Sequence, residues 1–167
     1  MAAVPASPTR PNMPSGYGIN TEAGGMLTWE WVDSQLTKSR NYWIGSTRPD
    51  GRPHVTPVWG VWMDGAVYFS SDPNSRRARN IAANPEVVVH LESGDDVVIL
   101  EGRVELVTDT DLYKRVGKVY NKKYKMPVFS DSEPGSPLYE VKPRLVMAWQ
   151  ESDFPNTATR WIFDEQK

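Results

Sequence analysis

Residues 41–71 constrain the fold most strongly, because they hold three β-rich runs separated by two turn signals. Pro49-Asp50-Gly51 marks the first turn, and Asp64-Gly65 is the best two-residue hairpin signal in the chain. Pro57 has no N–H for a strand ladder, so the second run should carry a bulge or an exposed edge there. The runs predict strands at about Tyr42 to Thr47, His54 to Met63 and Ala66 to Ser71.

The rest of the chain predicts helices placed between further strands. Helices are expected from the N-cap Thr28 to about Ser39, from Asp72-Pro73-Asn74-Ser75 to near Asn84, and from about Thr110 to Lys122. Ala78, Ile81 and Ala82 should face inward in the second helix, and Thr108 or Asp109 should cap the third. Strands are expected at Val87 to Glu92, Val97 to Val107, near Arg144 to Glu151 and near Arg160 to Phe163, with a loop from Pro127 to Pro137. Six or seven mostly antiparallel strands with three edge helices indicate a mainly β fold, a small antiparallel split β-barrel.

The first 25 residues differ in composition from the rest of the chain. Prolines recur every third residue from Pro5 to Pro14, and no apolar segment of a signal peptide follows the start. This composition favours extended, solvated backbone, so residues 1–25 should form a flexible Pro/Gly-rich arm, which can also fold over a partner subunit. Residues 26–167 fit a single domain of ordinary size.

Charge and cysteine content exclude several classes of function. Lys and Arg total 19 against 21 Asp and Glu, and the formal charge of −2 argues against a nucleic acid as the main ligand. The absence of cysteine excludes disulfides, thiolate zinc sites, iron–sulfur clusters and cysteine nucleophiles. No apolar run approaches the roughly 18 residues of a membrane helix. We therefore expect a soluble, cytoplasmic protein that binds neither nucleic acid nor membrane.

Common catalytic motifs are missing. The sequence has no G-x-x-x-x-G-K, G-x-G-x-x-G, H-E-x-x-H or G-x-S-x-G pattern. His54 and His90 are the only imidazoles, and neither has a second His or a carboxylate at metal-ligand spacing, so no metal is expected. Each can be an ordinary strand residue, and His54, which opens a strand beside Arg52, is also a candidate binding residue. No side chain is assigned as catalytic.

The most informative local feature is Ser75-Arg76-Arg77, followed by Arg79. Cations in the first turn of a helix face the positive end of the helix dipole, which is unfavourable unless an anion is present. A phosphate at that terminus would accept backbone N–H bonds, the Ser75 hydroxyl and one or two guanidinium groups together. The alternative is a solvated basic face whose arginines pair with nearby acids.

Two tryptophans lie in the central strand. Strand alternation places Trp59 and Val61 on one face, and Val58 and Trp62 on the other. One Trp can belong to the core while the other walls a pocket, in which backbone groups freed at Pro57 hold a planar ring. Alternatively, both Trp side chains cover the ends of the barrel.

The third predicted helix carries a strip of cations. These are Lys114, Arg115, Lys118, Lys122, Lys123 and Lys125. The strip can be a solvated helix face, or it can bind a polyanionic tail or a nucleotide.

The segment from Gly51 to Glu92, with ILEGRVELV after it, resembles the pyridoxamine 5'-phosphate oxidase-like split barrels, which include FMN oxidases and flavin/deazaflavin oxidoreductases. The resemblance implies an FMN-binding split-barrel fold and a homodimer with the cofactor at the interface. It also implies a set of cofactor-binding residues. His54, Val55, Thr56, Pro57, Val58 and Trp59 would lie along the ring and ribityl chain, Phe69 and Ser70 at a strand end, and Ser75, Arg76 and Arg77 at the phosphate.

Departures from the family pattern select among its branches. HVTPVW replaces the RxVLLK-type segment of true pyridoxamine phosphate oxidases, and their C-terminal substrate motif is not recognisable. The chain looks more like the deazaflavin branch, whose coenzyme F-420 carries a lactyl phosphate and an oligoglutamate tail. The resemblance thus predicts hydride transfer from F-420 to an unsaturated or conjugated small molecule, with an FMN-dependent oxidoreductase or a non-catalytic flavin-binding protein as alternatives.

Overall fold

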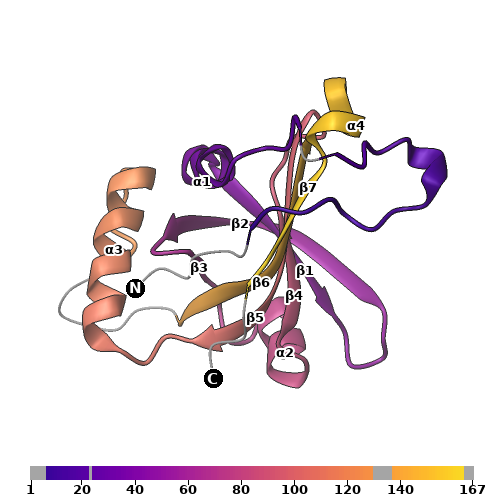
Figure 1. Ribbon diagram of the computed structural model, residues 1–167. Helices are drawn as coiled ribbons and strands as arrows, with labels where there is room; N and C mark the ends of the chain where they lie inside the picture. Colours follow the sequence, from indigo (N-terminus) through magenta and orange to yellow (C-terminus); the bar gives the residue numbers. More distant parts are fainter. Residues whose placement is uncertain (1–6, 23, 130–136, 164–167) are drawn as a thin grey trace.

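The computed structural model describes residues 7–22, 24–129 and 137–163, which form an antiparallel sheet with helices at its periphery (Figure 1). The strands are β1 (Asn41–Thr47), β2 (Pro53–Met63), β3 (Ala66–Ser70), β4 (Glu86–His90), β5 (Asp96–Leu106), β6 (Leu138–Gln150) and β7 (Thr159–Ile162). The helices are α1 (Trp29–Lys38), α2 (Arg76–Ala83), α3 (Thr110–Tyr124) and α4 (Phe154–Thr157), with single 3-10 turns at Ser15–Tyr17 and Glu151–Asp153.

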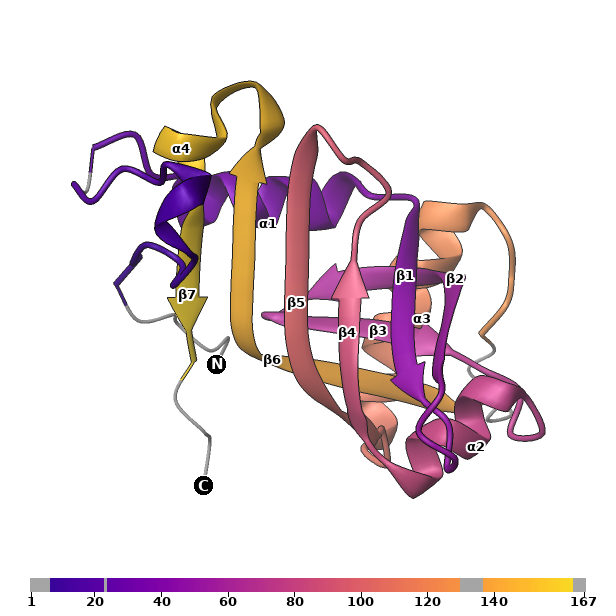
Figure 2. The same ribbon diagram turned by 90° about the vertical axis from the view of Figure 1, so that its right-hand side faces the viewer.

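Strands β1 to β6 close into a barrel. The strand order is β3-β2-β1-β4-β5-β6-β7, and β3 also pairs with β6, so the sheet returns on itself and leaves β7 outside on β6. Figure 2 shows β7, β6, β5, β4 and β1 side by side, with β2 and β3 crossing behind them. The predicted mainly β split barrel is confirmed.

The edge predicted at Pro57 is present, and a bulge is not. Strand β2 pairs with β1 over the whole length of β1, and Pro57 stands opposite Trp43 in an unbroken register. Strand β3 pairs only with the far part of β2, from Gly60 to Met63. One side of residues 53–59 therefore has no strand partner, which is where a proline is tolerated.

Strand β6 begins earlier than the sequence indicated. The sequence predicted a loop from Pro127 to Pro137, of which residues 130–136 lie outside the described ranges, and a strand from about Arg144, but β6 starts at Leu138. Pro143 pairs with Gly102 where the β5–β6 register shifts, and this irregularity accommodates the proline. Only glycine fits at position 102, because an added Cβ would collide with the carbonyl oxygen of Lys142.

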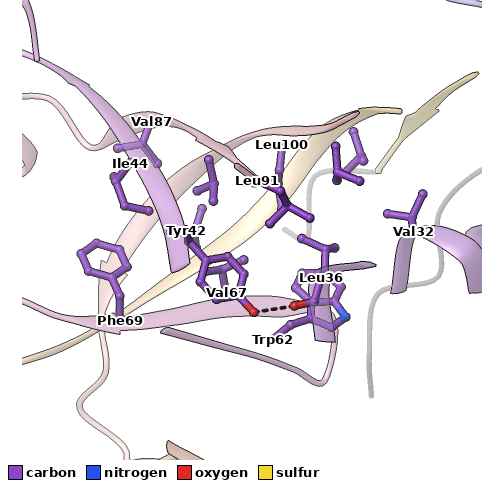
Figure 3. Close-up of a cluster of buried hydrophobic side chains, with 14 of the residues drawn as sticks. Val32, Leu36, Tyr42, Ile44, Trp62, Val67, Phe69, Val87, Leu91 and Leu100 are labelled. Carbon is purple, nitrogen blue, oxygen red and sulfur yellow. Dashed lines mark hydrogen bonds between the residues drawn. The ribbon is translucent and has the colours of Figure 1, made fainter. Parts of the chain in front are cut away.

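The barrel wall separates two hydrophobic clusters. Val58 and Trp62 of β2 belong to the larger cluster, which α1 covers and Figure 3 shows, whereas Val61 faces the smaller cluster under α3. Within the larger cluster, the Tyr42 hydroxyl donates to the Leu36 carbonyl oxygen over 2.5 Å. Both faces of β2 are therefore packed, as strand alternation predicted.

The helix boundaries follow their capping residues. Thr28 accepts a bond from the N–H of Trp31 at the start of α1, and Asp109, one of the two predicted caps, accepts bonds at the start of α3. In α2 the inward set is Ala78, Asn80 and Ile81. The prediction that Ala82 faces inward is wrong, because Ala82 is exposed and Asn80 is buried in its place.

Part of the predicted arm lies against the domain. Thr9 and Arg160 exchange backbone hydrogen bonds of 2.7 and 2.8 Å at an isolated bridge on β7. The guanidinium of Arg10 donates to the carbonyl oxygens of Glu22, Gly24, Asn156 and Ala158. The division of the chain at residue 25 stays a prediction.

Candidate functional site

Helix α2 begins with positive charge and no acidic residue in its first turn. Ser75 is the N-cap, and its hydroxyl accepts a 3.0 Å bond from the N–H of Ala78. The hydroxyls of Ser71 and Ser75 lie 2.8 Å apart and share a hydrogen bond. Arg76 and Arg77 follow at the positive end of the helix dipole, an arrangement that an anion would stabilise.

Arg77 joins α2 to the free edge of β2. Its Nη1 donates to Thr56 Oγ1 over 2.6 Å, and its Nη2 donates to Ser71 Oγ over 3.2 Å. Its guanidinium also lies 5.6 Å from the ring centre of Phe69. The Nε atom is buried and has no partner among the described residues. Burial lowers the pKa of Arg77, and the group stays charged because an arginine pKa lies far above neutral. The side chain is thus a partly desolvated cation held by neutral hydroxyls.

Two further arginines surround His54. Arg48, in the turn between β1 and β2, and Arg76 join Arg77 in acting on the imidazole. Burial, followed by these three positive charges, lowers the pKa of His54 and favours its neutral form. Among the described residues, no carboxylate lies within ion-pair distance of Arg48, Arg76 or Arg77. The cluster therefore has the charge of an anion-binding site.

The edge of β2 next to this cluster offers backbone groups. An unpaired strand edge exposes N–H and C=O groups at alternate residues, and residues 53–59 have such an edge. Pro57 contributes no donor there. A planar ring with hydrogen-bonding heteroatoms fits an edge of this kind.

The structure brings together only part of the predicted site set. The residues gathered at the cluster are His54, Thr56, Phe69, Ser75, Arg76 and Arg77. Val55, Pro57 and Trp59 project from the opposite face of β2, because successive side chains alternate. Val58 packs in the larger cluster, and the Ser70 hydroxyl donates to the Pro137 carbonyl oxygen over 3.0 Å.

Two residues at the cluster were missed from the sequence. Arg48 belongs to the turn Arg48-Pro49-Asp50-Gly51, where the sequence indicated only a turn and no functional residue. The β1–β2 register, with Thr47 opposite Pro53, brings Arg48 next to His54 and would have indicated it. Ser71 precedes the helix-starting segment, and its hydroxyl bonds both Ser75 and Arg77. The spacing of four residues between Ser71 and Ser75 was the one sequence signal that could have indicated this residue.

Trp59 is held away from the cluster. Its ring stacks on Tyr124 at a centroid distance of 4.5 Å, and the Arg40 guanidinium lies 5.6 Å from both rings. Tyr124 donates to the Gly60 carbonyl oxygen over 2.7 Å. These contacts fix the C-terminal end of α3 to β2, so Trp59 forms part of a helix–strand joint.

The cationic strip of α3 divides into two groups. Lys114, Lys118, Lys122 and Lys125 are exposed. Arg115 pairs with Asp64 in the β2–β3 turn. Lys123 instead points inward and donates to the Gly60 carbonyl oxygen over 2.8 Å, and burial lowers its pKa to about 8. The prediction of one continuous strip is therefore wrong for Lys123.

A hollow of about 370 Å³ lies on the outer face of the barrel, and His54 and Val55 are among the residues that line it. Charged residues of neighbouring strands also line it: Glu86, Glu101 and Arg144. Val55 is 51% exposed, Val88 38% and Ile162 46%, which is high for aliphatic side chains on one sheet face.

Within the described ranges, no three His, Asp or Glu side chains are grouped to hold a metal ion. No helix in that same part of the chain is long and apolar enough to cross a membrane.

A family model described as "Pyridoxamine 5'-phosphate oxidase" matches residues 29–150, which include the barrel, α2 and α3. The chain belongs to the pyridoxamine 5'-phosphate oxidase family. No curated protein shows significant sequence similarity to the chain.

Solved structures with this fold have different descriptions. A conserved hypothetical protein from Mycobacterium tuberculosis has a TM-score of 0.66 and 24% identity, over 77% of this chain and 88% of that one. A protein described as an F-420 reductase has a TM-score of 0.56 and 24% identity, over 68% and 94% of the two chains. A FAD-binding protein from Mesorhizobium loti has a TM-score of 0.58 and 21% identity, over 81% and 95%. At these identities the likeness shows the fold.

Proposed function

We propose that this protein is an oxidoreductase that binds coenzyme F-420 and transfers hydride to an unsaturated or conjugated small molecule. The observation that carries the proposal is the cluster of Arg48, Arg76 and Arg77 at the start of α2, beside the free edge of β2. Membership of a family that includes flavin-dependent oxidoreductases supports this class of activity.

The cluster would hold the phosphate of the cofactor. The buried Nε of Arg77, the Ser75 hydroxyl and the first N–H groups of α2 are donors of the kind that bind phosphate. Each charge-assisted bond of this kind contributes about 1.5 to 3 kcal/mol to binding. The residues present therefore fit a phosphate-bearing cofactor.

The edge of β2 would position the ring. Backbone groups of residues 53–59 orient it, and Phe69 and Tyr139, whose rings stack at 5.4 Å beside Arg77, limit the access of water. The bound deazaflavin itself supplies the hydride chemistry. This chain contributes binding and orientation, which agrees with the lack of an assigned catalytic side chain.

The choice of F-420 rests on the exposed lysines of α3. The stack of Trp59 on Tyr124 fixes the end of α3 three residues along β2 from Thr56, about 10 Å at the rise of an extended strand. Because Trp59 and Thr56 lie on opposite faces of β2, an acidic tail leaving the phosphate cluster would have to pass the free edge of this strand to reach the lysines at that end. The fold likeness to an F-420 reductase favours the same cofactor.

FMN is the second candidate. The cluster recognises a phosphate, which FMN also has, and the fold is shared with a FAD-binding protein. Absorbance and fluorescence titration of the purified protein with F-420 and with FMN separates the two. Tighter binding of F-420, followed by F-420-dependent reduction of a conjugated acceptor, supports the proposal, and binding of neither cofactor refutes it.

We further propose that a second copy of the chain covers the outer sheet face, with the cofactor at the interface. The exposed aliphatic side chains Val55, Val88 and Ile162 and the adjoining hollow support this arrangement. Sedimentation at micromolar concentration should show a dimer. A monomer that still binds cofactor fully would contradict it.

A further inference from the structure

His54 lies between two bonds that attach α2 to the barrel. Its cross-strand neighbour Ser46 accepts a 3.0 Å bond from Asn80, and Thr56, two residues along the same face of β2, accepts the 2.6 Å bond from Arg77. Both Asn80 and Arg77 belong to α2. The imidazole is therefore held next to the first two turns of this helix.

Several buried polar atoms around His54 have no hydrogen-bond partner in the described structure. They are Nδ1 of His54, Oδ1 of Asn80, Nε of Arg48 and Nε of Arg77. Asn80 is fully buried. Unpartnered buried groups are uncommon, and several in one region are what a site completed by a bound ligand would show. Three of these four groups are cations or can become cations, so the ligand should be an anion.

Charged groups lie near His54 on several elements. Arg76 and Arg77 belong to α2, and Arg48, Asp50 and Arg52 belong to the β1–β2 turn, where Asp50 is paired with Arg52. Glu86 of β4, Glu101 of β5 and Arg144 of β6 line the hollow that His54 also borders, and Glu86 is paired with Arg144. Burial and the arginines lower the pKa of His54, which favours the neutral imidazole in the free protein.

We propose that Arg48 and His54 are anion-binding residues of this site, and that His54 binds the anion in its protonated form. An entering anion offsets the arginine charges and adds a negative charge beside the imidazole, which favours a proton there. The protonated ring can donate from both nitrogens, so that Nδ1, which has no partner in the described structure, becomes a donor for the anion. Arg48 supplies its free Nε.

The proposal deepens the proposed function, on which it rests, because it concerns how the cofactor phosphate is held. A terminal phosphate monoester, as in FMN, carries up to two negative charges, whereas the phosphodiester of F-420 carries one. The monoester should therefore draw the proton onto His54 more strongly. Above about pH 7, where the monoester is fully ionised, binding of FMN should then weaken more steeply with rising pH than binding of F-420.

The decisive experiment follows the two histidine rings by NMR in the full chain. Sulfate is the main probe, because its charge is constant over the pH range used, and inorganic phosphate is the second. His90 is an internal control, since it stacks on Trp43 and its Nδ1 lies 2.8 Å from the Leu91 carbonyl oxygen. Saturating sulfate should raise the pKa of His54 by about one unit or more, and the His90 ring resonances should not move on addition of sulfate. An unchanged His54, or equal shifts in both rings, would overturn the proposal.

Variants test each residue separately. Arg48→Gln should weaken sulfate binding about five- to tenfold, whereas Arg79→Gln, an exposed arginine on the same helix, should change it less than twofold. His54→Gln should abolish the pH dependence of sulfate binding between pH 5.5 and 7.5. Equal binding by Arg48→Gln and Arg79→Gln refutes the role of Arg48. If neither flavin nor deazaflavin binds but sulfate shifts His54, the cofactor assignment fails and the anion site stands.

Discussion

Replacing Arg77 by alanine tests the centre of the candidate site. Of the five N–H donors of its guanidinium, one is given to Thr56 and one to Ser71, and Nε is left buried without a partner. A bound phosphate would accept from Nε and a neighbouring N–H. Loss of one such charge-assisted bond costs about 1.5 to 3 kcal/mol, which weakens binding about tenfold to a hundredfold.

The assay is a fluorescence titration of wild type and variants with F-420 and with FMN. Arg77→Lys keeps the charge without the planar fork and should fall between wild type and Arg77→Ala. Arg79→Ala is the matched control on the same helix. Thermal unfolding confirms that each variant is folded, since Thr56 and Ser71 can turn their hydroxyls to other partners. Binding by folded Arg77→Ala within twofold of wild type would refute the phosphate assignment.

Three other predictions concern α3 and the barrel. Replacing Lys114, Lys118 and Lys122 together with Gln should weaken binding of long-tailed F-420 at low salt and leave FMN binding unchanged. If wild type binds the long-tailed and tail-less forms equally at every salt concentration, these lysines are only a solvated helix face. Because the pKa of Lys123 is lowered to about 8 in the folded protein, the unfolded chain binds more protons above that pH, so wild type should gain stability relative to Lys123→Met as pH rises from about 8 toward 10. The gain should be well under about 1.4 kcal/mol per pH unit, since solvent screens the half-buried amine. Urea unfolding at several pH values measures it, and a stability difference that does not change with pH would contradict the prediction. Gly102→Ala should lower the free energy of unfolding, measured in urea, by about 2 kcal/mol or more, whereas Gly94→Ala should lower it far less because position 94 has open space around it. Equal losses in the two variants would show that the backbone moves to relieve the close β5–β6 approach.

Much of the fold could be predicted because its signals are local. The Asp64-Gly65 turn, the Thr28 and Asp109 caps and the alternation along β2 each depend on neighbours within a few residues. The start of β6 could not be predicted, because Pro143 is accommodated only by the register shift opposite Gly102, a feature of two strands distant in sequence.

The candidate site was predictable in part for the same reason. Ser75-Arg76-Arg77 is a local helix start, and it could be recognised from the chain alone. Arg48 and Ser71 join it only after the β1–β2 turn and the end of β3 are brought to α2. The direction of Lys123 was equally hidden, because the spacing of cations on α3 does not reveal that the Gly60 carbonyl oxygen accepts from this one.

Closure of the barrel by β3 and β6 has a consequence for how the chain folds. Val67 pairs with Val141, so this seam joins parts of the chain that are far apart in sequence, whereas β2 and β3 meet through a two-residue turn. Pairing of segments distant in sequence has a larger loop-closure entropy cost, which must be overcome before any contact forms to offset it, and this slows folding. The β1–β2–β3 meander should therefore form early and the β3–β6 seam last. Substitutions at the seam would then speed unfolding and leave the folding rate almost unchanged.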